Sequence, residues 1–200
     1  MSNNSSTGGY LLPIPGQNPG VGNLTFEQFL QSVFVGVSGL PGGLVRPKWQ
    51  LDPPKQPPVH VNWLAIGLSE TDADVFAYTG SLSGSDPNVL MRMEELTVQA
   101  TFYGPDAYDF ASITRDGFQL PQNLEALGRA KMTFAYTDRM MRVPDVVNER
   151  WVNRWELGVH LRRQIVRSYP VLTFLSGNGI LSVNNEGDGV TDQSIPVEEQ

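Results

Sequence analysis

The longest run of alternating apolar and polar residues covers Arg150–Tyr169. One parity holds Trp151, Trp155, Leu157, Val159, Leu161 and Ile165, and the other holds Arg150, Arg154, Glu156, His160, Arg162 and Gln164. A period of two is typical of a strand with one buried and one polar face. The pattern continues for about 16 residues, whereas a strand usually has about 5–6 residues. We therefore expect part of this strand to project beyond the core and to pair with another element or chain.

A second long strand is predicted over Val89–Tyr103, where Leu96, Val98, Ala100 and Phe102 share one face. It is the natural antiparallel partner of residues 150–166. The apolar face ends near its start, so that end is expected to protrude. We place four charged residues near the ends of the two long strands at subunit contacts: Arg92, Glu94, Arg150 and Arg154.

Helical spacing predicts a first helix over Phe26–Val37, and every apolar residue on its stripe is expected to be core. Thr25 and Gln28 form a capping box, Leu24 is placed to staple against Phe29, and Gly39 ends the helix. A second helix is expected from Pro105, at its first position, to Gly117. A short third helix follows over residues 120–129.

The remaining pattern completes an α+β fold: a twisted, mainly antiparallel sheet with two or three helices packed on it. Further strands are predicted over His60–Leu68, which is apolar enough to be covered on both faces, over Ala73–Tyr78 and over Met132–Tyr136. Residues 139–147 are expected to form a connector between the strand at Met132–Tyr136 and the alternating run at Arg150–Tyr169. The segments VLTFL and GILSV are expected to form a last hairpin around Ser176–Gly179, because Asn-Gly is a strong turn signal.

The chain divides into a flexible arm over residues 1–22, a single domain over residues 23–183, and a flexible acidic tail over residues 184–200. The arm is rich in Gly, Pro, Ser and Asn, and its apolar residues begin with Tyr10, Leu11 and Leu12. Terminal disorder and docking on a neighbouring subunit both remain open for the arm. The tail carries −5 of the net charge of −7, so the rest of the chain is close to neutral.

A proline-rich segment, Leu44–Pro58, cannot be a central strand and is expected to be extended at the surface. Trp49 lies in it, with Arg46 and Lys48 close by. Two interpretations remain open: a hook that faces a partner, or a lid folded onto the domain.

No catalytic, cofactor or metal site is predicted. The chain has no cysteine, which excludes disulfides and thiolate ligands. His60 and His160 lack a second ligand at helical or hairpin spacing, and His160 is expected to be solvated. No G-x-S-x-G elbow or phosphate loop is present. Glu94 and Glu95 are adjacent in a strand, so they point to opposite faces and cannot share one acid–base site.

Partners are constrained by the same composition. No apolar run of about 18 residues exists, so no membrane span or membrane contact is expected, and the start of the chain does not resemble a signal peptide. Arg162 and Arg163, with Arg167, form the only basic cluster, either solvated or facing an acidic partner. Tight phosphate binding is therefore not expected, although a surface past which DNA slides is allowed.

Six segments together resemble the neck or tail-terminator proteins of tailed bacteriophages, over roughly residues 9–175. They are GYLLP, GLPGGLVRPKWQLDPPKQPP, NWLAIGL, MRMEELTVQATFYGPDA, RDGFQLPQNLEAL and VNERWVNRWELGVHLRR. The resemblance implies a non-enzymatic virion protein that needs no cofactor, forms a ring that is expected to be a hexamer, and extends its long strands towards neighbouring subunits. The ring would cap the tail tube, end its polymerisation and join it to the head connector.

The resemblance also implies a set of partners and a location. The partners are further copies of the chain, the tail tube protein and a head–tail connector or adaptor protein, and DNA passes through the lumen without specific binding. The location is the neck of the virion, after assembly in the host cytoplasm. Two alternatives remain: a head–tail adaptor or head-closure ring, and, in a different class, a small ligand-binding or enzymatic α+β domain.

Overall fold

The structure is a computed structural model that describes residues 8–15, 25–80, 88–147, 149–171, 177–181 and 193–197. The helices in these ranges are α1 (Phe26–Ser38), α2 (Ala107–Gly117) and α3 (Glu125–Arg129), with 3-10 turns at Gly42–Leu44 and Pro121–Leu124. The strands are β1 (Val45–Pro47), β2 (Trp63–Ala73), β3 (Tyr78–Gly80), β4 (Val89–Tyr103), β5 (Met132–Thr137), β6 (Met141–Arg142), β7 (Asp145–Val147), β8 (Arg150–Val152), β9 (Arg154–Ser168), β10 (Gly177–Leu181) and β11 (Gln193–Val197).

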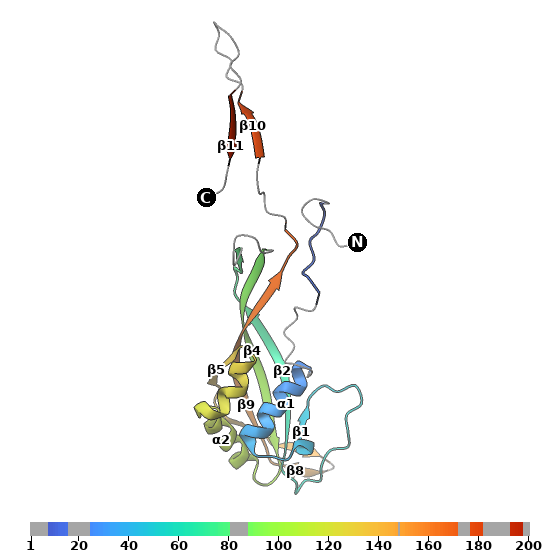
Figure 1. The fold of residues 1–200 in the computed structure, drawn as a ribbon. Coiled ribbons are helices and arrows are strands. Elements are labelled where there is room, and N and C mark those ends of the chain that lie inside the picture. The colour runs from blue at the N-terminus through green and yellow to red at the C-terminus, as the bar shows by residue number, and fades with distance from the viewer. Residues whose placement is uncertain are drawn as a thin grey trace.

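Seven strands form the main sheet, in the order β1-β2-β4-β9-β5, with β3 beside β4 and β6 beside β9. Only β1 and β2 pair in parallel, and every other pairing is antiparallel. The sheet does not close into a barrel, and the helices pack over its lower half (Figure 1). The predicted α+β class is confirmed.

Helix α1 has the local signals predicted for it. The Thr25 hydroxyl accepts from the Gln28 N–H, the Gln28 side chain accepts from the Thr25 N–H, and Gly39 ends the helix at φ 72°. Its buried stripe consists of Phe29, Leu30, Val33, Phe34 and Val37. Phe26 is only half-buried and packs against the edge of this core, and Leu24 lies outside the described residues.

The predicted pairing of the two long strands is confirmed. Strands β4 and β9 are antiparallel along their whole length of 15 residues each, from Val89 opposite Ser168 to Tyr103 opposite Arg154. The buried residues of the pair include Leu96, Val98, Ala100, Phe102, Leu157, Val159 and Leu161, each at most 1% exposed. Trp155 packs at the margin of this core. The far ends of both strands extend past the helices (Figure 1).

The alternating run at 150–169 is interrupted, so the predicted burial of Trp151 is wrong. Residues Arg150–Val152 form β8, which pairs with β7 in a separate small sheet. The Asn153 carbonyl accepts from the Gly104 N–H instead of continuing the ladder. The alternation shifts by one residue at this break, so Trp151 is 75% exposed and Val152 only 7%.

The separate strand predicted at Ala73–Tyr78 is also wrong. The strand predicted at 60–68 begins at Trp63 and runs on to Ala73, because the long β4 offers partners to the polar stretch after a bulge between Leu68 and Glu70. Leu64, Ala65 and Ile66 are all buried, as expected for a strand covered on both faces.

Two boundaries differ as well. Pro105 lies in a turn, and α2 begins at Ala107. The connector at 139–147 contains two short strands, β6 and β7, because β9 and β8 provide partners for them.

The last predicted hairpin pairs differently. Strand β10 contains Asn178 and Gly179 and pairs with β11, so the predicted turn lies inside a strand. Most of the segment VLTFL lies outside the described residues. Strand β11 falls within the acidic tail of residues 184–200, whose flexibility stays a prediction.

Candidate assembly surface

The upper part of the sheet has a free edge on each side. Strand β1 covers β2 only as far as Ile66, with one further hydrogen bond from the Lys48 N–H to the Ile66 carbonyl. Strand β5 covers β9 only as far as Arg163. Among the described strands, none pairs with the outer side of β2 beyond these contacts, and none pairs with the outer side of β9 beyond Arg163. Unpaired edges of this kind are ready templates for pairing with another chain.

The hydrogen-bond pattern shows which backbone groups point outward on the β2 edge. The Asp74 N–H donates to the Met93 carbonyl, so alternation along the ladder turns the N–H groups of Ala73 and Thr71 away from β4. The Ala73 N–H bonds to the Asp72 carboxylate at 2.8 Å, as an outward group would. Thr71 is exposed, so its backbone is available to a neighbouring strand.

The two free edges carry opposite charges. Glu70 and Asp72 are exposed along β2, whereas Arg167 is half-buried in the part of β9 that β5 leaves uncovered. Both strands run towards the same end of the sheet, because each is antiparallel to β4. The edges therefore match in strand direction and in charge.

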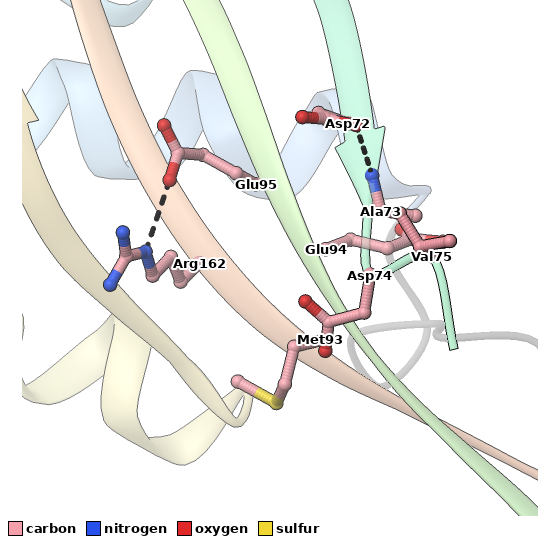
Figure 2. Close-up of a pocket in the computed structure, with 8 residues that line it drawn as sticks. All are labelled: Asp72, Ala73, Asp74, Val75, Met93, Glu94, Glu95 and Arg162. Carbon is pink, nitrogen blue, oxygen red and sulfur yellow. Dashed lines mark hydrogen bonds and ion pairs between the residues drawn. The ribbon is translucent and has the colours of Figure 1, made fainter. Parts of the chain in front are cut away.

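A groove of about 570 Å³ lies beside the β2 edge (Figure 2). Its lining contains Asp72, Ala73, Asp74, Val75, Met93, Glu94, Glu95 and Arg162. Glu95 is paired with Arg162 and Glu94 with Arg163. The carboxylates of Asp72 and Asp74 have no arginine or lysine partner among the described residues, so the groove keeps a negative balance.

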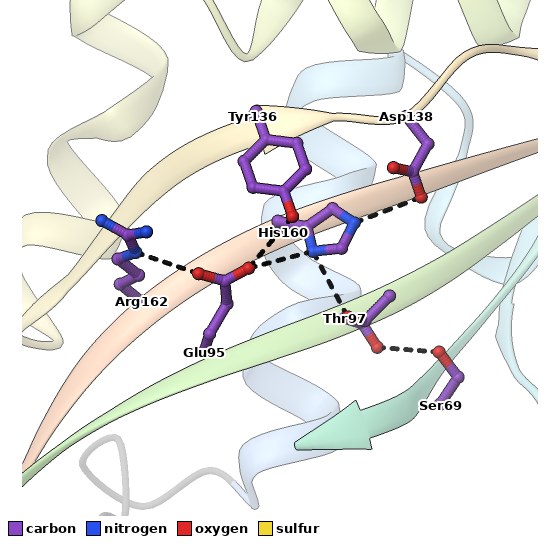
Figure 3. A network of polar contacts seen from close by, with 7 residues as sticks. All are labelled: Ser69, Glu95, Thr97, Tyr136, Asp138, His160 and Arg162. Atoms are coloured by element: carbon purple, nitrogen blue, oxygen red, sulfur yellow. Dashed lines mark hydrogen bonds and ion pairs between the residues drawn. The ribbon is translucent and has the colours of Figure 1, made fainter. Parts of the chain in front are cut away.

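On the open face of the sheet, His160 is held in a polar network (Figure 3). Its Nε2 lies 3.1 Å from an Asp138 oxygen, and its Nδ1 lies 3.4 Å from Glu95 and 3.3 Å from the Thr97 hydroxyl. Tyr136 stacks on the imidazole ring with the centroids 4.1 Å apart. The expectation of a solvated His160 is therefore wrong, because its side chain is only 12% exposed.

The hydrogen bonds and ion pairs of this network hold its side chains in fixed positions. The Arg162 guanidinium donates to Glu95 at 3.1 Å and holds the pKa of that carboxyl below its ordinary value of 4.5. The Tyr136 hydroxyl donates to the same carboxylate at 3.1 Å. The Ser69 hydroxyl donates to the Thr97 carbonyl and does not reach His160, so no serine–histidine pair forms. The network links β4, β9 and the end of β5.

The N-terminal arm docks beside the tip of the sheet. The Ile14 N–H donates to the Ser168 carbonyl at 2.9 Å. Leu11 is half-buried and lines a groove of about 480 Å³ with Thr79, Gly80, Asn88, Val89, Leu90, Tyr169 and Val171. Tyr10 is 93% exposed and Leu12 is 71% exposed.

The proline-rich segment combines both interpretations of Trp49. Its ring lies against Gly67, where an added Cβ would come within 2.4 Å of it, yet the residue is 68% exposed. Arg46 donates to the Lys55 carbonyl at 2.8 Å and so ties the segment to itself. Lys48 donates to Gln99, and its burial lowers the pKa of its ammonium group to about 8. Trp49 therefore caps the sheet and still presents a face to solvent.

The predicted charged residues separate into different places. Glu94 and Arg163 pair at 2.8 Å, and Arg92 is half-buried two residues away with its Nε unpaired among the described residues. Arg154 lies at the opposite end of the sheet, where it pairs with Glu156 and with Asp145, and Arg150 is exposed close by. The eleven predicted contact residues therefore do not form one continuous surface.

Sequence reasoning missed two parts of this surface. Val75 and Phe76, between β2 and β3, are 85% and 89% exposed. The sequence pattern predicts a strand for both residues, and only the acidic residues around them indicate that their side chains are exposed. The Glu95–His160 contact depends on the strand register, which no local pattern encodes.

Within the described residues, no group of three or more His, Asp or Glu side chains is arranged to hold a metal ion. No helix there is long and apolar enough to cross a membrane. Open strand edges and exposed apolar side chains are features of proteins that assemble with other chains. The family model described as phage neck terminator protein matches residues 25–190, and the chain belongs to this family. No curated protein matches the chain.

Proposed function

We propose that this neck protein of a tailed phage forms a closed ring, a hexamer, at the head-proximal end of the tail. The ring caps the tail tube, ends its polymerisation and joins it to the head connector or adaptor protein. DNA passes through the lumen without specific binding, in keeping with a near-neutral main domain. Assembly takes place in the host cytoplasm, and no enzymatic step is involved.

The two free edges carry this proposal. Pairing the β2 edge of one copy with the β9 edge of the next joins two different surfaces, and such heterologous contacts form a ring when the rotation between copies closes. Because both edges run in the same direction, rotation about an axis inclined to the strands brings the end of β2 in one copy beside the part of β9 beyond Arg163 in the next, without reversing either strand. The acidic β2 edge then faces Arg167 of β9, which favours this pairing over two like edges.

The test begins with native mass spectrometry and negative-stain images of the full chain, alone and mixed with growing tail tubes. We expect a six-copy ring alone, and rings at one end of tubes that have stopped growing. Rings that bind the connector and leave tube growth unchanged would instead support the head–tail adaptor. A monomer that retains a small ligand would support the ligand-binding alternative.

The Thr71→Pro variant tests the edge itself. Proline removes the outward N–H and leaves the bonds to β4 intact, and Thr71→Val keeps the N–H as a matched control. We expect Thr71→Pro to fold, with a circular dichroism spectrum like that of the control, and to remain monomeric. Normal rings from the proline variant would exclude the β2 edge as the interface.

A further inference from the structure

The described part of the N-terminal arm, residues 8–15, docks on the sheet through one of its sides. Exposure alternates along this segment. Tyr10 and Leu12 are exposed, and Leu11, which lies between them in the chain, is half-buried in the groove at the tip of the sheet. This alternation is the pattern of an extended segment whose successive side chains point to opposite sides. The docked arm therefore presents two large apolar side chains on its outer side.

The position of the arm follows from the β9 ladder. The Tyr169 N–H donates to the Asn88 carbonyl, so the adjacent Ser168 carbonyl points away from β4. The Ile14 N–H bonds to this carbonyl and so lies at the outer edge of β9. The arm thus continues the β9 edge that the proposed ring uses.

A complementary apolar pair lies on the other edge. Val75 and Phe76 directly follow β2 and are almost fully exposed. The register places Asp74 opposite Met93, and Met93 opposite Gln164, so Val75 and Phe76 lie near the level of the upper part of β9. The rotation that relates neighbouring copies brings Val75 and Phe76 of one copy towards the arm of the next copy.

We propose that Tyr10 and Leu12 of one copy pack against Val75 and Phe76 of the next copy. This contact forms the apolar centre of the ring interface, flanked by the charged strand edges. The inference rests on the proposed ring and identifies which side chains hold it together. Large apolar and aromatic side chains at the centre of an interface are typical of the residues that dominate its affinity.

Disulfide trapping tests the contact without background, because the chain has no cysteine of its own. Two single-cysteine variants, Leu12→Cys and Phe76→Cys, are mixed, assembled and oxidised, and the products are separated on a non-reducing gel. We expect a covalent dimer that contains one copy of each variant. The matched control replaces Leu12→Cys with Leu51→Cys, a residue that is 97% exposed in the proline-rich segment, and should give no dimer.

Native mass spectrometry of the same mixture separates failure of the contact from failure of the ring. Rings with the mixed dimer support the contact, whereas rings without it, or with equal trapping by the control, overturn the contact and keep the ring. Absence of rings overturns both. As a second measurement, the Tyr10→Ser, Leu12→Ser double variant should weaken ring formation about tenfold or more, because two apolar side chains lose their burial. Unchanged ring stability on dilution would also overturn the contact.

Discussion

At the scale of single residues, Phe34 shows how the core depends on one side chain. It is fully buried in α1, and its ring meets that of Phe118 edge to face with the centroids 5.3 Å apart. Phe118 in turn stacks on Phe134 of β5. One aromatic row thus joins the first helix to the residue after the second helix and to an edge strand.

Phe34→Ala should lower the free energy of unfolding by about 3–5 kcal/mol, since it leaves a cavity where three elements meet. Urea unfolding followed by circular dichroism measures this change. Ile113→Ala, at a residue of α2 that is 52% exposed, is the control and should have little effect. Equal stability of the two variants would mean that α1 is not part of the core.

Glu95 is the residue whose protonation is most directly set by a neighbour. The bond from Arg162 lowers the pKa of its carboxyl in the folded protein, so this ion pair stabilises the fold above the ordinary pKa of 4.5. The contribution is lost as the pH falls through the lower, folded-state pKa. An NMR titration should show a pKa below 4.5 for Glu95, and Arg162→Ala should raise it. A value at or above 4.5 in the unmutated protein would contradict this prediction.

At the scale of elements, β4 and β9 present two different faces with adjacent residues. Arg163 and Glu94 lie on the helix-covered face, with side chains 15% and 12% exposed, and the Arg163 guanidinium lies 4.7 Å from the Phe26 ring centroid. Arg162 and Glu95 lie on the open face, with side chains 57% and 28% exposed. The two strands are thus joined by two ion pairs of similar geometry, one on each face of the sheet.

Arg163→Ala should therefore lower the free energy of unfolding far more than Arg162→Ala does. Removing Arg163 leaves the Glu94 carboxylate largely buried without its partner, at a cost of about 3–5 kcal/mol. Removing Arg162 breaks an exposed pair and should change the stability little. Chemical denaturation of the two variants measures both changes, and similar losses would mean that the helix does not shield the Glu94 pair.

At the scale of the whole molecule, the chain separates into a packed lower half, a projecting strand ribbon and a terminal hairpin (Figure 1). The hairpin of β10 and β11 forms a two-stranded sheet of its own. Two-stranded ribbons are at best marginally stable alone, so the main sheet carries the stability of the fold.

Deletion of residues 184–200 should leave the melting temperature of the main domain unchanged, because β11, the part of the tail that the structure describes, pairs with β10 outside the main sheet. We expect the defect to appear in the joining of tails to heads, which can be counted in electron micrographs of an infected-cell lysate. A drop of several degrees in melting temperature would show that the tail stabilises the domain. Normal yields of joined particles would exclude a role for the tail in the neck.

The sequence by itself determined the elements whose information is local. The capping box and Gly39 define the ends of α1, and alternation predicts β4 from Val89 to Tyr103 without error. Both depend on neighbours within a few residues, which the chain order specifies directly. The family resemblance also agrees with the match over residues 25–190.

Only the tertiary structure decided the features that depend on a distant partner. The length of β2 and the break at Asn153 follow from what β4 and β7 offer across the sheet. The His160 network and the apolar pair at Val75 and Phe76 follow from strand register and from where the helices stop covering the sheet. Alternation predicts that a strand has two faces, but the neighbouring strands and helices determine which face is buried and which edge stays open, because burial is a property of the packed chain.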